Sequence, residues 1–255
     1  MKAHHQYTTE IRDKFGYLAT WAPNFPLRLG DVGLVEDRVF TPVTTLSRLG
    51  IKFESREPGS ASDSEHSSAG SVTMTFKASG QAPATGSLLS TAEAGITIEF
   101  RTENSVVFQA AGCRETIMLG LDELGKTIIA KHKANEWKPE FVVVTSVVEA
   151  GAATIIISSG SNGQFELATS GSAGSAGLSL VDVKGSFRIV SARNVGTKIV
   201  ATSGLTPLFR ASSLCKSIFG DTFKSRGTSA ETLDRSSGLR FAEIDYSDED
   251  FQRTT

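Results

Sequence analysis

The stretch of residues 71–100, SVTMTFKASGQAPATGSLLSTAEAGITIEF, most constrains what this chain folds into. Apolar and polar side chains alternate at both of its ends, and the apolar positions are Val72, Met74, Phe76, Ala78, Ile96, Ile98 and Phe100. A period of two is typical of a β-strand with one buried face. Between the two arms lies a small, polar tract that contains Gly80, Pro83 and Gly86. The stretch therefore predicts a long β-hairpin.

A second region repeats this architecture. Its arms are residues 153–168 and 178–192, and the tract TSGSAGSAG joins them. No side chain of that tract is large enough to pack into a core. Two such hairpins in one chain favour an α+β fold built on a mostly antiparallel sheet.

Helices and one further strand are predicted between and after these hairpins. A spacing of four, three and four residues predicts a helix, and the apolar residues that follow it are Ile117, Leu121, Leu124 and Ile128. Residues 140–148, EFVVVTSVV, predict a buried strand because most of them are β-branched. Residues 205–224 predict a second helix, with Leu208, Cys215, Ile218 and Phe219 on one side.

The first seventy residues predict less regular structure. After a short polar opening, prolines and glycines divide short strand-like runs up to residue 54, which indicates irregular sheet. Residues 55–70, SREPGSASDSEHSSAG, have almost no apolar side chain. We expect them to form a mobile loop, because they bury too little to offset the entropy of ordering.

The composition is that of a globular protein made in a reducing compartment. The chain has 255 residues, of which 39% are hydrophobic and 21% charged, and a formal net charge of -2. It has two cysteines, Cys113 and Cys215, without CxxC spacing, and no Asn-x-Ser/Thr acceptor. No signal peptide and no run of ~20 apolar residues is present. We therefore expect a soluble, cytoplasmic protein with no nucleic-acid partner.

Charge is segregated along the chain. Eight basic residues lie between Lys184 and Arg226, against one acid, Asp221. The last fifteen residues hold five acids against one base, Arg253. The basic segment predicts an electrostatic footprint for an anionic surface.

One string fits a nucleotide-binding motif. GLDELGKT, residues 120–127, has the phosphate-loop pattern GxxxxGK[ST]. A phosphate loop must be a turn that presents backbone N–H groups, whereas the predicted helical stripe runs through this string. An amphipathic helix is the favoured interpretation, and a nucleotide-dependent enzyme that uses Lys126 is the alternative.

Other catalytic patterns are weaker. The four histidines, His4, His5, His66 and His132, lack metal-ligand spacing to a second histidine or cysteine. His4 and His5 form a polar terminal pair that binds metal at most adventitiously. We interpret both cysteines as small packed residues. The prediction is a protein that is not an enzyme and has no cofactor and no metal.

Two alternating hairpins with small tips also suit a membrane. A membrane β-strand needs roughly 9 to 11 tilted residues, apolar toward lipid and polar toward water at alternate positions. The arms 71–79 and 94–103 have that length. An ordinary half-buried sheet shows the same alternation, so a β-rich binding module with a permanent sheet is the alternative.

The order of elements and several strings resemble the gasdermin family of pore-forming proteins, above all its fungal cell-death members. The strings are YLATW, LGDVG and VFTPVTTLSRLGI near the N-terminus and EFVVVTSVVEAG in the middle. The layout of hairpin, helix, strand, hairpin and basic helix covers roughly residues 7–224. The first cysteine is Cys113, and about thirty residues follow the last predicted helix, so we expect neither the lipidated cysteine of several bacterial members nor the large inhibitory domain of the animal members.

The resemblance implies a single pore-forming domain over residues 1–224, with a twisted sheet and packed helices, and a flexible linker and acidic tail over 225–255. It implies oligomerisation on acidic phospholipids of the plasma membrane and refolding of two hairpin regions into a β-barrel pore. The consequence would be programmed, pyroptosis-like lytic cell death, as in heterokaryon incompatibility and innate immunity.

The resemblance also assigns candidate residues. The membrane-inserting candidates are Val72, Met74, Phe76, Ile96, Ile98, Phe100, Ile155, Ile157, Phe165, Leu178, Leu180, Phe187 and Ile189. The lipid-binding candidates are Lys184, Arg188, Arg193, Lys198, Arg210 and Lys216.

Two modes of control are open. In one, the tail docks through Phe241, Ile244, Tyr246 and Phe251, and an activating protease cuts at Arg226, Arg235 or Arg240. In the other, the chain is inactive until it assembles with a related but different subunit. We favour the partner slightly, because a short tail buries little area.

Overall fold

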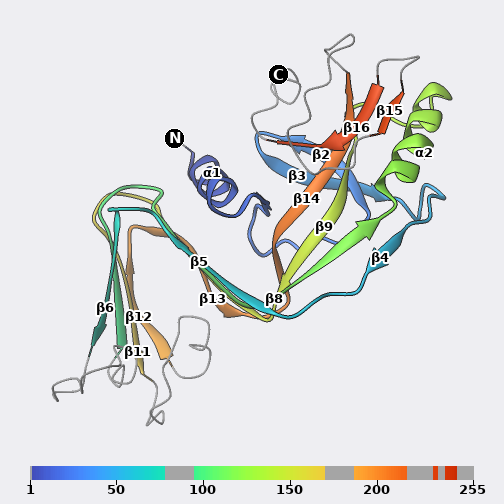
Figure 1. Cartoon of the computed structure of the whole chain (residues 1–255). Coiled ribbons are helices and arrows are strands. Elements are labelled where there is room, and N and C mark those ends of the chain that lie inside the picture. Colours follow the sequence, from blue (N-terminus) through green and yellow to red (C-terminus); the bar gives the residue numbers. More distant parts are fainter. Residues whose placement is uncertain (1, 78–94, 170–186, 217–231, 235–238, 246–255) are drawn as a thin grey trace. The chain divides into compact units, whose positions relative to one another are not determined.

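The structure, a computed structural model, describes residues 2–77, 95–169, 187–216, 232–234 and 239–245 (Figure 1). These residues form a mostly antiparallel β-sheet protein with two helices, which confirms the predicted α+β class at this level. The chain divides into two compact units that interleave along the sequence. Unit 1 comprises Met1–Gly16, Ser60–Arg114 and Ala150–Leu205, and unit 2 comprises Tyr17–Gly59, Glu115–Glu149 and Thr206–Thr255.

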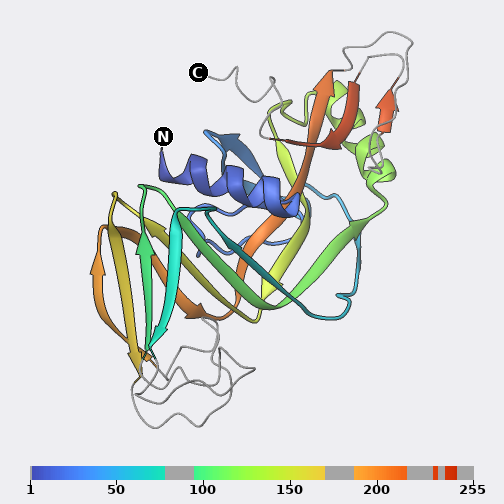
Figure 2. The same cartoon turned by 60° about the vertical axis from the view of Figure 1, so that its left-hand side comes forward.

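Unit 1 contains one helix and two sets of paired strands. Its elements are α1 (Ala3–Phe15), β5 (Ser62–Ser67), β6 (Val72–Lys77), β7 (Gly95–Phe100), the first part of β8 (Val106–Leu119), β10 (Ala152–Ser158), β11 (Gly163–Thr169), β12 (Phe187–Arg193) and β13 (Val195–Thr202). Four strands form a separate sheet in the order β12-β11-β7-β6, here called the hairpin sheet (Figure 2). In the other set, β8 pairs with β5 and β10, and β10 pairs with β13.

The unit 1 core joins the two sets of strands. One buried cluster contains Ile96, Ile98, Phe100, Val107, Ile156, Phe165, Leu167 and Val195. The hairpin sheet therefore buries one face against β8, β10 and β13, while its opposite face carries polar residues such as the exposed Glu99.

Helix α1 was not predicted, although its sequence carries a signal. Tyr7 and Ile11 are fully buried, four residues apart, and Phe15 follows after four more. The Phe15 ring lies 5.6 Å from that of Phe108 on β8. These apolar side chains, on one side of the helix, pack α1 onto unit 1, while most of its other side chains are polar. The helix ends at Gly16, whose backbone has φ of 71° and whose N–H donates to the Arg12 carbonyl.

Unit 2 contains the second helix and the remaining strands. Its elements are β1 (Leu18–Ala19), β2 (Asp31–Glu36), β3 (Val39–Thr45), β4 (Glu54–Arg56), the end of β8, α2 (Leu121–Lys133), β9 (Val142–Ala150), β14 (Leu205–Lys216), β15 (Thr232–Asp234) and β16 (Leu239–Glu243). The strand order is β8-β9-β14-β16-β15, and β2 pairs with both β3 and β9. β2 and β3 form the expected N-terminal sheet through a two-residue turn at Asp37 and Arg38, both with positive φ.

Several predicted elements are confirmed. β6 and β7 pair as an antiparallel hairpin, with Met74 opposite Ile98. β9 matches the predicted strand at 140–148. The predicted helix exists as α2, but it begins at Leu121, so Ile117 belongs to β8.

The helix predicted over 205–224 is wrong for residues 205–216, which form strand β14. Leu208 and Phe209 are adjacent, so they point to opposite faces of β14, and both are buried, which means that both faces of the strand are covered at this point. A strand buried on both faces lacks the strict alternation of a half-buried strand, so its apolar residues could be fitted to a helical spacing. Residues 217–224 lie outside the described residues.

The mobile loop predicted over 55–70 is also wrong for residues 55–56, which lie in β4, and for residues 62–67, which form β5. This strand has no apolar side chain of its own and is held by backbone pairing with β8. The arm predicted over 153–168 is two strands: β10 pairs with β8, whereas β11 belongs to the hairpin sheet. Of the predicted flexible linker 225–240, residues 232–234 and 239–240 lie in β15 and β16.

Candidate functional site

The first candidate site is the hairpin sheet of unit 1. Its register is set by Lys77 opposite Gly95, Ile96 opposite Leu167, and Thr169 opposite Phe187. The chain leaves β6 after Lys77 and β11 after Thr169, and it enters β7 at Gly95 and β12 at Phe187. These four chain ends therefore lie at one end of the sheet. The segments that connect them, 78–94 and 170–186, lie outside the described residues.

Most of the membrane-inserting candidates that the structure describes lie on this sheet. Ile96, Ile98, Phe100 and Phe165 are in the unit 1 core, and Val72 and Met74 pack against it. Ile155 and Ile157 are buried on β10 instead, outside the hairpin sheet. Phe76 and Phe187 lie on β6 and β12, and the structure does not describe their side chains; Leu178 and Leu180 lie outside the described residues.

The outer strand β12 exposes apolar side chains. Ile189 and Val190 are each 51% exposed, and within the described residues β12 pairs with β11 alone. A register shift between Glu166 and Leu167 leaves Ile189 opposite Leu167 and Ser191 opposite Glu166. Directly opposite residues share a face of a sheet. Ile189 therefore lies on the apolar face, and Ser191 lies on the polar face.

The second candidate site is a charged cluster in unit 2, here called the Arg210 cluster. It consists of Tyr17, Glu115, Ser146, Arg210 and Glu243. Arg210 Nη1 donates to Glu243 Oε1 at 2.9 Å, and its Nε lies 4.0 Å from Glu115 Oε1. The guanidinium also stacks 4.3 Å from the centre of the Tyr17 ring. Ser146 Oγ donates to Glu115 Oε1 at 2.6 Å.

This cluster places a predicted lipid-binding residue against the C-terminal strand. Glu243 belongs to β16, which lies between β14 and β15. Phe241 and Ile244 are 1% and 2% exposed, so residues 239–244 are part of the unit 2 core rather than a solvated end. The expectation that this tail buries little area is therefore wrong for these residues. Tyr246 and Phe251 lie outside the described residues.

Burial and the Glu115 carboxylate shape the pKa of Tyr17, and the carboxylates of Glu115 and Glu243 balance the charge of Arg210 in this cluster. Burial raises the pKa of the Tyr17 phenol, and the Glu115 carboxylate raises it further, while Arg210 lowers it. The Arg210 charge is compensated by Glu243 and Glu115. Arg210 is therefore engaged with Glu243, Glu115 and the Tyr17 ring, although its side chain remains 36% exposed.

The other charged candidates are spread over both units. Arg193 and Lys198 are exposed, at the end of β12 and on β13. Arg188 and Lys216 lie on β12 and β14, and their side chains are not described; Lys184, Arg226 and Arg235 lie outside the described residues. Arg240 lies on β16 opposite Cys215 of β14 and Leu233 of β15. A protease would reach Arg240 only after this strand has left the sheet.

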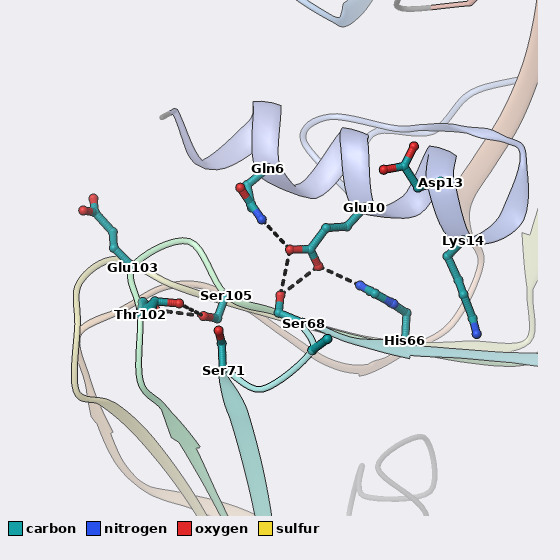
Figure 3. A pocket seen from close by; sticks show the side chains of 11 residues that line it. Gln6, Glu10, Asp13, Lys14, His66, Ser68, Ser71, Thr102, Glu103 and Ser105 are labelled. Atoms are coloured by element: carbon teal, nitrogen blue, oxygen red, sulfur yellow. Dashed lines mark hydrogen bonds and ion pairs between the residues drawn. The ribbon is translucent and has the colours of Figure 1, made fainter.

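The third candidate is a polar cavity of about 600 Å³ in unit 1, between α1 and two turns (Figure 3). Glu10 of α1 is at its centre. Its carboxylate accepts hydrogen bonds from Gln6 Nε2 at 2.5 Å and from Ser68 Oγ at 2.7 Å, and His66 Nε2 lies 2.6 Å away. Asp13, Lys14 and Glu103 also line the cavity. Sequence reasoning missed this cluster because Glu10 and His66 are 56 residues apart, and neither lies in a motif.

The phosphate-loop string forms no loop. Gly120 precedes α2, and the Leu124 N–H donates to the Gly120 carbonyl at 3.0 Å, as in the first turn of a helix. Gly125 and Lys126 lie within the helix, which confirms the helical interpretation. Lys126 Nζ lies 3.9 Å from Asp122 one turn earlier, with both side chains well exposed.

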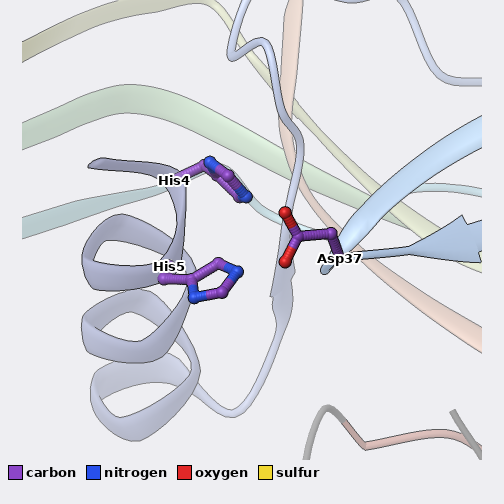
Figure 4. A group of neighbouring side chains, drawn as sticks. All are labelled: His4, His5 and Asp37. Carbon is purple, nitrogen blue, oxygen red and sulfur yellow. The ribbon is translucent and has the colours of Figure 1, made fainter. Parts of the chain in front are cut away.

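The remaining reactive residues are unremarkable in chemistry. Cys113 is buried, and burial raises the pKa of its thiol, so little nucleophilic thiolate forms. Cys215 is partly buried on β14. His4 and His5 occupy the first turn of α1, with ring centres 4.6 Å apart and planes nearly perpendicular (Figure 4).

Within the described residues, no helix is long and apolar enough to cross a membrane. Neither a scan against protein-family models nor a search of curated proteins finds a match for this chain.

Proposed function

We propose that the protein forms pores in membranes, in the manner of the gasdermin family that its sequence resembles. In this proposal the described structure is the closed form, and hairpins β6–β7 and β11–β12 refold into membrane-crossing strands of an oligomer. One observation carries the proposal. The register of the hairpin sheet brings the connecting ends of both hairpins to the same end of one sheet.

Strand length sets what refolding requires. β6 and β7 have 6 residues each, and β11 and β12 have 7. A membrane strand needs roughly 9 to 11 residues. Each hairpin must therefore recruit residues from segments 78–94 and 170–186. The sequence of the second segment supports this, because Val181 and Val183 continue the phase of Ile189, while Asp182 and Lys184 alternate with them.

Refolding conserves apolar burial. Ile96, Ile98 and Phe165 leave the unit 1 core and exchange contacts with β8 and β10 for contacts with lipid. This exchange needs a membrane as the partner, because exposing the same face to water costs about 25 cal/mol per Å². In water without a membrane, the hairpin sheet therefore stays packed on β8 and β10.

Recruitment to the membrane uses positive charge. Arg193 and Lys198 are exposed in unit 1 and are available to acidic phospholipid. Each basic residue near an anionic leaflet contributes about 1 kcal/mol. Replacing both by glutamate should weaken binding to anionic vesicles without loss of fold, since exposed charges contribute little to stability.

Two triggers remain part of the proposal. Because β16 is paired with β14 and buried, we favour release of this strand as the trigger. Assembly with a divergent subunit is the alternative trigger. Dye-loaded vesicles separate the two when three samples are compared: the full chain, a chain that ends at residue 238, and the full chain mixed with a divergent variant. Leakage from vesicles that contain acidic phospholipid, and not from neutral vesicles, is expected for at least one sample. Circular dichroism must show that the shortened chain is folded.

A matched pair of variants tests the hairpins directly. Ile189→Lys adds charge to the apolar face, yet Ile189 is 51% exposed in the closed form, so folding should survive. A lysine on the lipid face at mid-membrane costs about 2–4 kcal/mol, so leakage should fall strongly. Ser191→Lys adds the same charge two residues away on the polar face. This variant should release dye from vesicles as fast as the wild type does. Equal leakage by both variants would contradict the assigned strand phase.

Intact vesicles in all three samples would overturn pore formation. The permanent-sheet binding module would then be the better account of the two hairpins.

A further inference from the structure

A hydrogen-bond chain runs from α1 to the base of hairpin β6–β7. The single Ser68 O–H donates to the Glu10 carboxylate, with Oγ 2.7 Å from one carboxylate oxygen and 3.0 Å from the other. Ser68 Oγ in turn accepts from the Val106 N–H at 2.8 Å, and the Ser68 N–H donates to the Val106 carbonyl at 3.0 Å. Ser68 therefore ties α1 to the first residue of β8.

The same chain continues into the hairpin. The Ser71 N–H donates to the Ser68 carbonyl at 3.2 Å, and the Arg101 N–H donates to the Ser71 carbonyl at 2.8 Å. Ser71 precedes β6, and Arg101 follows β7. The base of the hairpin, opposite the end where its connecting segment begins, is thus attached through Ser68 to Glu10.

The carboxylate suits this position because of its hydrogen-bonding capacity. An ionised carboxylate only accepts hydrogen bonds, and it offers two oxygens to several donors. Here the neighbours are Gln6, Ser68 and His66, and the Glu10 and His66 side chains are only 16% and 15% exposed. A neutral amide of the same shape would turn an NH₂ group toward one of these donors. Glu10 is therefore more than a solvated charge on a polar helix.

We propose that Glu10 is a latch that couples the position of α1 to the freedom of hairpin β6–β7. Apolar contacts of Tyr7, Ile11 and Phe15 hold α1 on unit 1, and Glu10 connects this held helix to the hairpin base. When Glu10 is released, the turn at residues 68–71 loses its attachment to α1, and the hairpin opens from its base more often. The role in pore opening rests on the proposed function, whereas the coupling itself is a property of the protein in solution.

Hydrogen exchange in solution, without membranes, tests the coupling. The variant is Glu10→Gln, and the matched control is Asp13→Asn, which removes a charge from the same helix at an exposed position of the same cavity. Because a hydrogen bond to a charged group is lost, amides at 68–75 and 95–101 should exchange about tenfold faster in Glu10→Gln. Amides of β9 in unit 2 should not change, and Asp13→Asn should behave as the wild type.

Two results would overturn the latch. One is unchanged exchange at 68–75 and 95–101 in Glu10→Gln, and the other is faster exchange confined to α1. If Glu10→Gln does not fold, Gln6→Ala removes a single donor, and the same amides should accelerate by a smaller factor; unchanged rates there would equally reject the proposal.

Vesicle leakage separates this inference from the proposed function. If both hold, Glu10→Gln should leak dye from anionic vesicles faster than Asp13→Asn under the same trigger. If pore formation is wrong, neither variant leaks, yet the exchange experiment still reports whether Glu10 controls the hairpin.

Discussion

Strand β14 in unit 2 and strand β12 in unit 1 differ in what covers them. β16 covers β14 and buries Phe241, Ala242 and Ile244 to 5% exposure or less. Within the described residues β12 pairs only with β11, and it leaves Ile189 half-exposed. An open edge with β-branched side chains is ready to pair with another strand, whereas a covered edge is not. Of these two strands, β12 is therefore the one whose edge is placed to pair with a further strand, while β16 ties the edge of β14 into the unit 2 core.

The hairpin sheet should not tolerate charge on its buried face. Ile98→Asp places a carboxylate at a fully buried position of the unit 1 core, which should cost more than about 4 kcal/mol and unfold unit 1. Thr75→Asp, at an exposed position of β6, is the control and should change stability by about 0.5 kcal/mol or less. Chemical denaturation followed by circular dichroism measures both. A stable Ile98→Asp protein would mean that this face is not a core in solution.

Removing the anchor of β16 should have the next largest effect. Phe241→Ala empties a buried site among Leu124, Ile128 and Trp137, and large-to-small changes of this kind cost about 3–5 kcal/mol. The free energy of unfolding, from denaturant titration, gives the value. Ile189→Ala on the open edge of unit 1 is the matched change and should cost much less. Equal losses would remove the contrast between a covered and an open edge.

The Arg210 cluster should contribute about 1 kcal/mol, because its side chains are only partly shielded from water. Arg210 is 36% and Glu243 is 23% exposed, which screens their attraction. A double-mutant cycle of Arg210→Met and Glu243→Gln measures their coupling. A coupling energy near zero would show that apolar contacts alone hold β16 in the sheet.

Alkaline pH should weaken unit 2 through Tyr17. Its pKa is raised in the folded protein, first by burial and then by Glu115. Above the ordinary tyrosine value of about 10, the unfolded chain loses this proton while the folded protein keeps it. The folded state then binds more protons, so stability falls as pH rises from there to the folded pKa. Tyr17→Phe should show a shallower loss between pH 9 and 11; an identical slope in both proteins would contradict the assignment.

Local pattern was enough for the elements whose environment is uniform along their length. β6 and β7 alternate because one face meets the unit 1 core and the other carries polar side chains, of which Thr73, Thr75 and Glu99 are exposed. β9 has a β-branched run because it is buried on both faces. α2 keeps its stripe, with Leu124 and Ile128 buried in unit 2. The spacing of Tyr7, Ile11 and Phe15 would also have predicted α1.

The sequence by itself thus determined the antiparallel pairing of residues 72–77 with 95–100, strand β9, and the helical form of the phosphate-loop string at 120–127. Tertiary structure alone decided that residues 205–216 are a strand, because β14 pairs with β9 and β16 and its adjacent residues Leu208 and Phe209 are both buried. It alone made β5 a strand, through backbone bonds to β8. It also brought Glu10 to His66 and Arg210 to Glu243, which are 56 and 33 residues apart. Burial of one face of an element produces a periodic pattern of apolar residues in the sequence. Pairing with a strand far along the chain produces no such pattern, so the sequence does not reveal it.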